Sequence, residues 1–103
     1  RATMDHFQYR RGRLFAEDVP LEAVAEKVGT PVFVYSHATL LRHIRAMEAA
    51  FDAYPHVTCY ALKANSNGAL LRILAREGVG ADIVSGGELH RARKAGIPGR
   101  RIV

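Results

Sequence analysis

Apolar and polar residues alternate along residues 57–62, then follow a helical period, and this change repeats once further along the chain. A period of two indicates a β-strand, whereas apolar residues three or four positions apart indicate a helix. From residue 57 the pattern predicts strand, helix, strand, helix and the start of another strand, at residues 57–62, 66–78, 81–84, 85–94 and 101–103. This order is typical of β/α units in a parallel sheet.

The first part of the chain has a different pattern. Two short apolar segments flank Arg10–Arg13, and Gly12 can adopt the positive φ that a tight turn needs, so we expect a β-hairpin there. A short amphipathic helix is predicted from Pro20 to Gly29, because proline suits a first helical turn and glycine suits a C-terminal cap.

A second strand-helix pair follows this short helix. Residues 32–35 are predicted to form a strand, and Ser36 is expected to cap a longer helix. Apolar residues recur on that helix at helical spacing, which predicts core packing rather than a cofactor surface. They are Leu40, Ile44, Met47 and Phe51.

Lys63 directly follows the alternating strand, and the alternation places it on the same face as Val57, Cys59 and Ala61. Among such small apolar groups we expect the amine to be desolvated, which favours a free amine that can attack an aldehyde or ketone. On local sequence alone, a strand-end lysine extending to solvent is the plainer alternative. The β/α context favours the catalytic interpretation, because chemistry in a β/α barrel lies at the carboxyl ends of the strands.

Asp82 and residues 85–88 follow the next predicted strand, so topology should bring them close to Lys63. Ser85 and Glu88 have the spacing of a capping box. The free backbone N–H groups at Gly86-Gly87 could attract a phosphate, but this is not a Walker or dinucleotide pattern, and Glu88 would repel an anion. A helix cap is therefore the favoured interpretation of residues 85–88.

Length and composition fit one small domain or part of a larger one. The 103 residues are 49% hydrophobic and 24% charged, and no apolar run approaches the roughly 18 residues that span a bilayer. We expect a cytoplasmic protein without membrane contact, in which the lone Cys59 is a small core residue. An eight-unit barrel takes roughly 250 residues, so the chain is expected to be the N-terminal part of a larger enzyme.

The net charge of +5 raises the possibility of nucleic-acid binding. The basic groups fall in separate predicted elements without interleaved aromatic residues, so we expect no nucleic-acid partner. The five histidines lack the spacing of a zinc site, and we expect no metal. They are His6, His37, His43, His56 and His90.

Three segments closely resemble the diaminopimelate decarboxylase family. They are Tyr60-Ala61-Leu62-Lys63-Ala64-Asn65-Ser66-Asn67, residues 80–89 and residues 95–98, and residues 7–10, 14–21 and 29–36 look like the start of that family. The resemblance implies a pyridoxal 5′-phosphate enzyme with a TIM-like (β/α)8 barrel of the alanine-racemase type. Residues 1–37 would then pack with a C-terminal β domain absent here, and residues 38–103 would form the first β/α units of the incomplete barrel.

The same resemblance implies roles for three residues. Lys63 would hold pyridoxal phosphate covalently, while Asp82 and Glu88 match acidic positions near that lysine that help set its protonation and orientation. The implied reaction is decarboxylation of meso-2,6-diaminopimelate to L-lysine and CO2, the last step of lysine biosynthesis, in a homodimer that binds a small amino-acid substrate. By itself the chain is expected to be inactive and prone to self-association, because an incomplete barrel exposes sheet edges.

Two alternatives remain open from the sequence. One is another pyridoxal-phosphate amino-acid decarboxylase or racemase of the same barrel type, since the lysine segment also suits those enzymes. The other is a module without enzymatic activity, either a carrier of pyridoxal phosphate or a basic nucleic-acid binder, for which salt-sensitive binding to DNA or RNA would be the sign.

Overall fold

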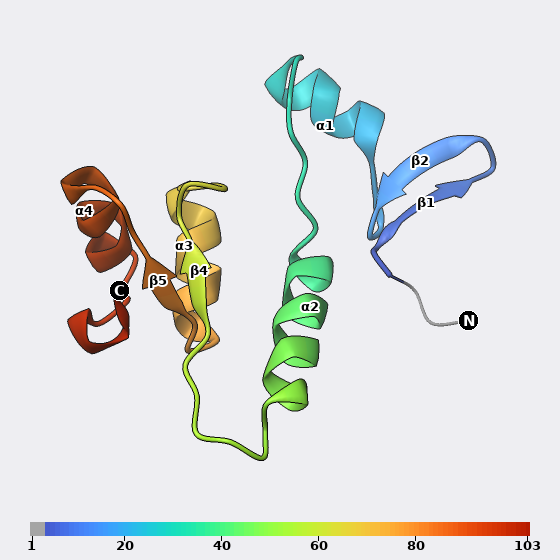
Figure 1. Cartoon of the computed structure of the whole chain (residues 1–103). Coiled ribbons are helices and arrows are strands. Elements are labelled where there is room, and N and C mark those ends of the chain that lie inside the picture. Colours follow the sequence, from blue (N-terminus) through green and yellow to red (C-terminus); the bar gives the residue numbers. More distant parts are fainter. Residues whose placement is uncertain (1–3) are drawn as a thin grey trace. The chain divides into compact units, whose positions relative to one another are not determined.

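The computed structural model describes residues 4–103 and divides the chain into two compact units, Arg1–Asp52 and Ala53–Val103. The first unit contains β1, β2, β3, α1 and α2 in chain order, and the second contains β4, α3, β5, α4 and a short 3-10 helix, η1 (Gly99–Arg101) (Figure 1). This division follows α2, whereas the predicted domain boundary at residues 37/38 falls after the first residue of that helix. The association of residues 1–37 with a β domain stays a prediction.

The predicted hairpin is present in the first unit. β1 (Phe7–Arg10) and β2 (Arg13–Ala16) pair antiparallel, and the two residues between them, Arg11 and Gly12, have φ of 52° and 77°. Positive φ at both positions is the geometry of a two-residue turn that matches the twist of the strands. A short strand that the sequence pattern did not predict, β3 (Val19–Pro20), extends the sheet along β2.

Both predicted helices of the first unit form. α1 (Leu21–Val28) ends at Gly29, whose φ of 86° suits glycine, and α2 (His37–Ala50) begins at Ser36, whose Oγ accepts the Thr39 N–H at 3.1 Å. The predicted strand at residues 32–35 is wrong. No described strand pairs with this segment, and the Phe33 side chain is 90% exposed, so neither backbone pairing nor burial supports an extended strand there.

The apolar stripe of α2 is not a closed core within this unit. Leu40 and Ile44 are half-buried, but Met47 and Phe51 are 49% and 48% exposed, so the expected core packing is wrong for these two residues. Helical periodicity identifies the apolar face of a helix, but burial depends on whether another element lies against that face.

Glu17, in the loop after β2, anchors the hairpin to the start of α2. Its Oε2 accepts the Ser36 hydroxyl at 2.9 Å and the Ala38 N–H at 3.3 Å. The Ser36 hydrogen bond, with a smaller effect from Ala38, lowers the pKa of the Glu17 carboxyl, and desolvation opposes this only in part. A carboxylate at this end of α2 also interacts favourably with the helix dipole.

The second unit has the strand-helix order that the sequence predicts. β4 (Cys59–Ala61) and β5 (Gly80–Asp82) are parallel, with Cys59 opposite Gly80 and Ala61 opposite Asp82. Ile102 forms a parallel bridge to Ala81, which places the predicted start of the next strand beside β5. The strands are shorter than expected, since the pairing covers three residues rather than the whole of 57–62 or 81–84.

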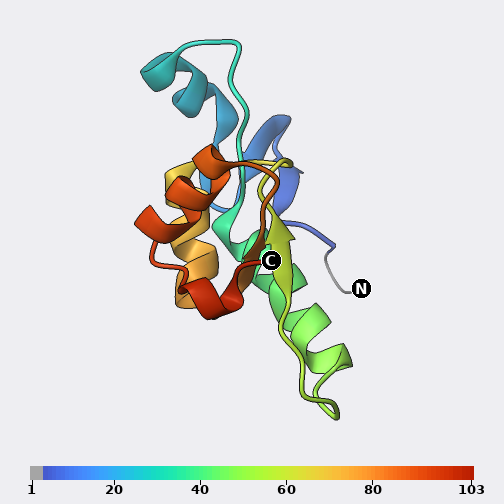
Figure 2. The ribbon, with the colours of Figure 1, turned by 60° about the vertical axis from the view of Figure 1, so that its left-hand side comes forward.

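Two helices cover one face of this sheet (Figures 1 and 2). α3 (Gly68–Arg76) is capped by Asn67, whose side chain accepts the Ala69 N–H at 2.9 Å, so the predicted start of this helix at Ser66 is wrong by one residue. α4 (Gly86–Lys94) begins at Ser85 as predicted. The buried core of the unit comprises Leu62, Leu71, Leu74, Val79, Ala81, Ala92 and Ile97.

Substitution of Gly80 tests how tightly β5 is packed against its neighbours. A Cβ at this position would collide with the backbone carbonyl of Arg101 and lie 2.9 Å from Cys59 Sγ. We therefore expect Gly80→Ala to lower the free energy of unfolding by about 1–3 kcal/mol, because neither the backbone nor a half-buried side chain can move away cheaply. Urea denaturation followed by circular dichroism measures this. Gly86→Ala is the matched control, because its Cβ would meet nothing within 4 Å, and equal midpoints for the two variants would contradict the expectation.

The Glu17 anchor predicts a pH dependence of stability. Because the pKa of Glu17 is lower folded than unfolded, its contribution is present above the unfolded pKa and is lost as pH falls through the folded value. From about pH 5 downward, wild type should lose more stability than Glu17→Gln, and the difference between them should shrink. Thermal unfolding across this range measures the difference, with the exposed Glu26→Gln as control. Parallel curves for wild type and Glu17→Gln would refute the anchor.

Candidate active site

Lys63 lies in a turn directly after β4, at the carboxyl end of that strand. The preceding residue, Leu62, is 1% exposed and donates its N–H to the Asp82 carbonyl at 3.1 Å. The Ala64 N–H donates to the Ala61 carbonyl at 3.1 Å, which closes the turn around Lys63. The buried Leu62 thus fixes the backbone from which Lys63 extends.

Two further side chains hold the segment after Lys63. Tyr60 Oη donates to the Asn65 carbonyl at 3.2 Å, and Arg91 of α4 donates from Nη1 to the Ser66 carbonyl at 3.3 Å. Neither residue was predicted to belong to the site. By the alternation along β4, Tyr60 points to the face opposite to Lys63. Arg91 follows Ser66 by 25 residues, so no local sequence pattern relates either residue to the lysine turn.

The register of the sheet places Asp82 close to the lysine turn. Ala61 and Asp82 are paired residues of adjacent parallel strands, so their side chains leave the same face of the sheet. Leu62 and Ala81 occupy the opposite face and are buried in the core. The face that carries Asp82 is lined along β4 by the small, half-buried Cys59 and Ala61. No large side chain of β4 therefore lies on this face of the sheet.

Glu88 has a different structural role from Asp82. Ser85 Oγ accepts the Glu88 N–H at 3.1 Å, and Glu88 Oε2 accepts the Val84 N–H at 2.7 Å. This is the predicted capping arrangement, except that the carboxylate reaches the residue before the N-cap rather than Ser85 itself. The structure thus brings Asp82 and the lysine turn together through the backbone, while the Glu88 carboxylate is engaged at the start of α4.

The environment of the Lys63 amine differs from the sequence-based expectation. The side chain is exposed, and no hydrogen bond or ion pair within residues 4–103 engages its amine. The expected desolvation is therefore absent from the described chain, because the strand ends before Lys63 and the small residues of its face do not enclose it. A primary amine that no other group of the described chain engages still fits covalent attachment of an aldehyde such as pyridoxal phosphate.

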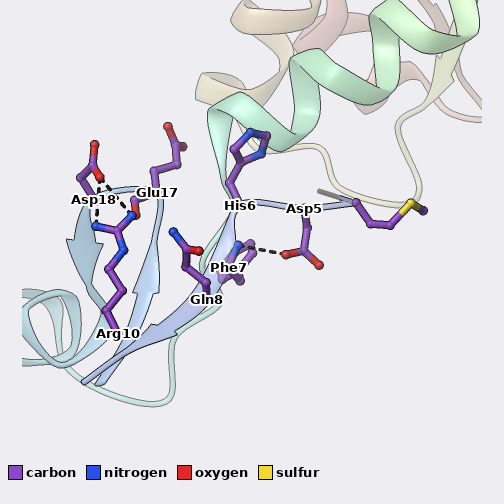
Figure 3. Close-up of a pocket in the computed structure, with 8 residues that line it drawn as sticks. Asp5, His6, Phe7, Gln8, Arg10, Glu17 and Asp18 are labelled. Atoms are coloured by element: carbon purple, nitrogen blue, oxygen red, sulfur yellow. Dashed lines mark hydrogen bonds and ion pairs between the residues drawn. The ribbon is translucent and has the colours of Figure 1, made fainter. Parts of the chain in front are cut away.

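A hollow in the first unit is lined by residues of that unit alone, and none of the three predicted site residues lines it (Figure 3). It measures about 430 Å³, and its polar groups interact with one another: Arg10 forms an ion pair with Asp18 at 3.2 Å, and Asp5 accepts the Phe7 N–H at 2.9 Å.

Across residues 4–103 no three His, Cys, Asp or Glu side chains gather as metal ligands. Within the same range no helix has the length and hydropathy to cross a bilayer.

The chain is similar in sequence to a known family and to several known proteins. The family model for the pyridoxal binding domain of pyridoxal-dependent decarboxylases matches residues 37–103. Diaminopimelate decarboxylase from Pseudomonas fluorescens is 52% identical over 100 residues, which cover 97% of this chain and 24% of that protein. The Aquifex aeolicus enzyme of the same name is 50% identical over 99 residues, covering 95% of this chain and 23% of that protein.

Solved structures agree with the curated relatives. A crystal structure of diaminopimelate decarboxylase from M. jannaschii is 35% identical, with a TM-score of 0.89, and the match covers 94% of this chain and 24% of that one. A complex of the same enzyme with L-lysine gives a TM-score of 0.82 at 36% identity, covering 95% of this chain and 24% of that one. The chain thus spans about a quarter of the length of the relatives that it matches.

These matches confirm the resemblance and the α/β barrel-type fold class inferred from the sequence. They also account for the order of β4, α3, β5 and α4, which lie within the matched residues. The chain belongs to the pyridoxal-dependent decarboxylase family, with residues 37–103 in its pyridoxal binding domain.

Proposed function

We propose that the protein containing this chain is a pyridoxal-phosphate enzyme that decarboxylates meso-2,6-diaminopimelate to L-lysine and CO2. The observation that carries the proposal is the position of Lys63, an accessible amine at the carboxyl end of β4 beside the end of β5. Support for the substrate comes from relatives named diaminopimelate decarboxylase, about 50% identical over almost the whole chain.

Lys63 is the residue that would hold the cofactor, through Nζ. The turn around it is fixed by Leu62 in the core and by the Tyr60 and Arg91 hydrogen bonds, so the amine extends from a defined backbone position. A fixed attachment point matters because the reacting groups must be aligned before the chemical step. When bound, pyridoxal phosphate supplies the electron sink that accepts the electron pair left by the departing carboxylate.

Asp82 and Glu88 would contribute in different ways. Asp82 is exposed at the strand end adjoining the lysine turn, where its carboxylate can help set the protonation and orientation of groups near Lys63. Glu88 holds the start of α4 through the Val84 N–H, so its contribution would be to position the loop after β5. A homodimer in the cytoplasm, acting on a small amino-acid substrate, completes the proposal.

Covalent labelling tests the role of Lys63. Incubation of the full-length protein with pyridoxal phosphate, followed by borohydride reduction and peptide mapping, should place the label on Lys63, because the amine there is accessible and unpaired within residues 4–103. Lys63→Ala should lose the label and reduce the decarboxylation rate by about 10³-fold or more. Lys27→Ala, at an exposed position of α1, is the matched control and should keep both the label on Lys63 and the decarboxylation rate. A label found only on other lysines would remove Lys63 from the mechanism.

Substrate assays separate this proposal from other members of the family. The full-length protein loaded with pyridoxal phosphate, but not reduced with borohydride, should release CO2 from meso-2,6-diaminopimelate faster than from L-ornithine or L-arginine, and it should not interconvert L- and D-alanine. Labelling of Lys63 combined with activity only toward another amino acid would keep the cofactor assignment and replace the substrate.

Replacement of each acidic residue, Asp82 or Glu88, by its amide should affect kcat to a different extent. We expect Asp82→Asn to lower kcat by about tenfold or more, since it lies at the strand end beside the lysine turn. Glu88→Gln should keep kcat within about threefold, because glutamine can still accept the Val84 N–H. Steady-state kinetics with meso-2,6-diaminopimelate measure both effects. If Glu88→Gln lost as much activity as Asp82→Asn, its carboxylate would act in the site rather than only in the cap.

A further inference from the structure

Two adjoining hollows lie between α3 and α4, on the helical side of the second unit. One, of about 270 Å³, is lined by Arg72 and Arg76 of α3 together with Ala95. The other, of about 170 Å³, is lined by Arg72, Ala95, and Arg91 and Lys94 of α4. Because the hollows share Arg72 and Ala95, they form one groove, which we call the α3–α4 groove.

We propose that the α3–α4 groove binds a small ligand that carries two or more negative charges of the phosphate type. Four cationic side chains line the groove, and no carboxylate does. No ion pair within residues 4–103 engages any of the four. Their joint charge is therefore available to an anion from solution.

The charge of the whole chain is concentrated in the unit that contains this groove. Residues 1–52 carry seven Lys or Arg and seven Asp or Glu, whereas residues 53–103 carry eight and three. The net charge of +5 therefore arises entirely from residues 53–103, and half of the basic residues there line the groove. Along the sequence the basic residues fall in separate elements, but the packing of α3 against α4 brings these four together.

The arrangement of the cations within each helix is unfavourable without a counter-charge. Arg72 and Arg76 are four residues apart on α3, and Arg91 and Lys94 are three apart on α4, so each helix places like charges side by side. The helix dipole accounts for cations in the last turn of a helix. It does not account for Arg72, whose Nη1 lies 3.4 Å from where a Cβ of Gly68 would be, beside the positive end of α3. A bound anion would relieve both repulsions.

The shape of the groove favours a small phosphate-bearing ligand over a polymer. Glycine and alanine form the rest of its lining, which lets a ligand approach the helices closely, and guanidinium groups can bind phosphate oxygens in pairs. No aromatic residue lines either hollow, so there is no surface on which a nucleobase would stack. Arg91 also donates to the Ser66 carbonyl, which holds its guanidinium at the groove.

Calorimetric titration with pyrophosphate tests this site. The full-length protein is first loaded with pyridoxal phosphate and reduced with borohydride, so that the cofactor site cannot take up the probe. At low ionic strength we expect saturable binding to the wild type. Arg72→Gln combined with Arg76→Gln should weaken binding by about tenfold or more, since each exposed cation contributes up to about fivefold.

The matched control removes two charges outside the groove, by Lys27→Gln combined with Arg100→Gln, and it should change the affinity by less than about twofold. Circular dichroism checks folding, and Lys94→Gln alone serves as a second groove variant if the double variant fails to fold. Absence of saturable binding, or equal losses in the groove and control variants, would overturn the proposal. Salt-sensitive binding of a single-stranded oligonucleotide alone, with no pyrophosphate binding, would overturn it in favour of a nucleic-acid surface.

Discussion

The parallel pairing of β4 with β5 is the constraint on which the site depends. The hydrogen bond from the Leu62 N–H to the Asp82 carbonyl continues the ladder by one residue and ties the two strand ends together. Leu62 is anchored in the core beneath α3 and α4, so the next residue must leave the sheet at its carboxyl end. The position of Lys63 therefore follows from the burial of its neighbour, and the position of Asp82 follows from the strand register.

Local patterns in the sequence predicted most of the elements. The alternation before Lys63 predicted β4, and the spacing of Ser85 and Glu88 predicted the start of α4, because both signals depend on residues close together in the chain. The positive φ of Gly12 and Gly29 was likewise expected from the turn and the helix end that they occupy. The choice of Lys63 as the candidate nucleophile came from the same local order of strand and helix.

Features that depend on distant partners could not be predicted in this way. Residues 32–35 have strand composition, but no described strand pairs with them. Ser66 and Asn67 can both cap a helix, and the Ser66 carbonyl instead accepts a hydrogen bond from Arg91, which comes from the next helix. The α3–α4 groove has the same origin, because periodicity shows which side chains share a helix face but not which face of another helix lies opposite.

The contrast between the buried Leu62 and the exposed Lys63 also limits how this segment can change length during evolution. Removal or insertion of one residue within β4 would exchange the two faces, turning the lysine side chain toward the core and a leucine toward solvent. Substitutions at individual positions carry no such exchange. We therefore expect length variation among relatives to concentrate in connections such as residues 52–58, while the spacing from Cys59 to Lys63 stays fixed.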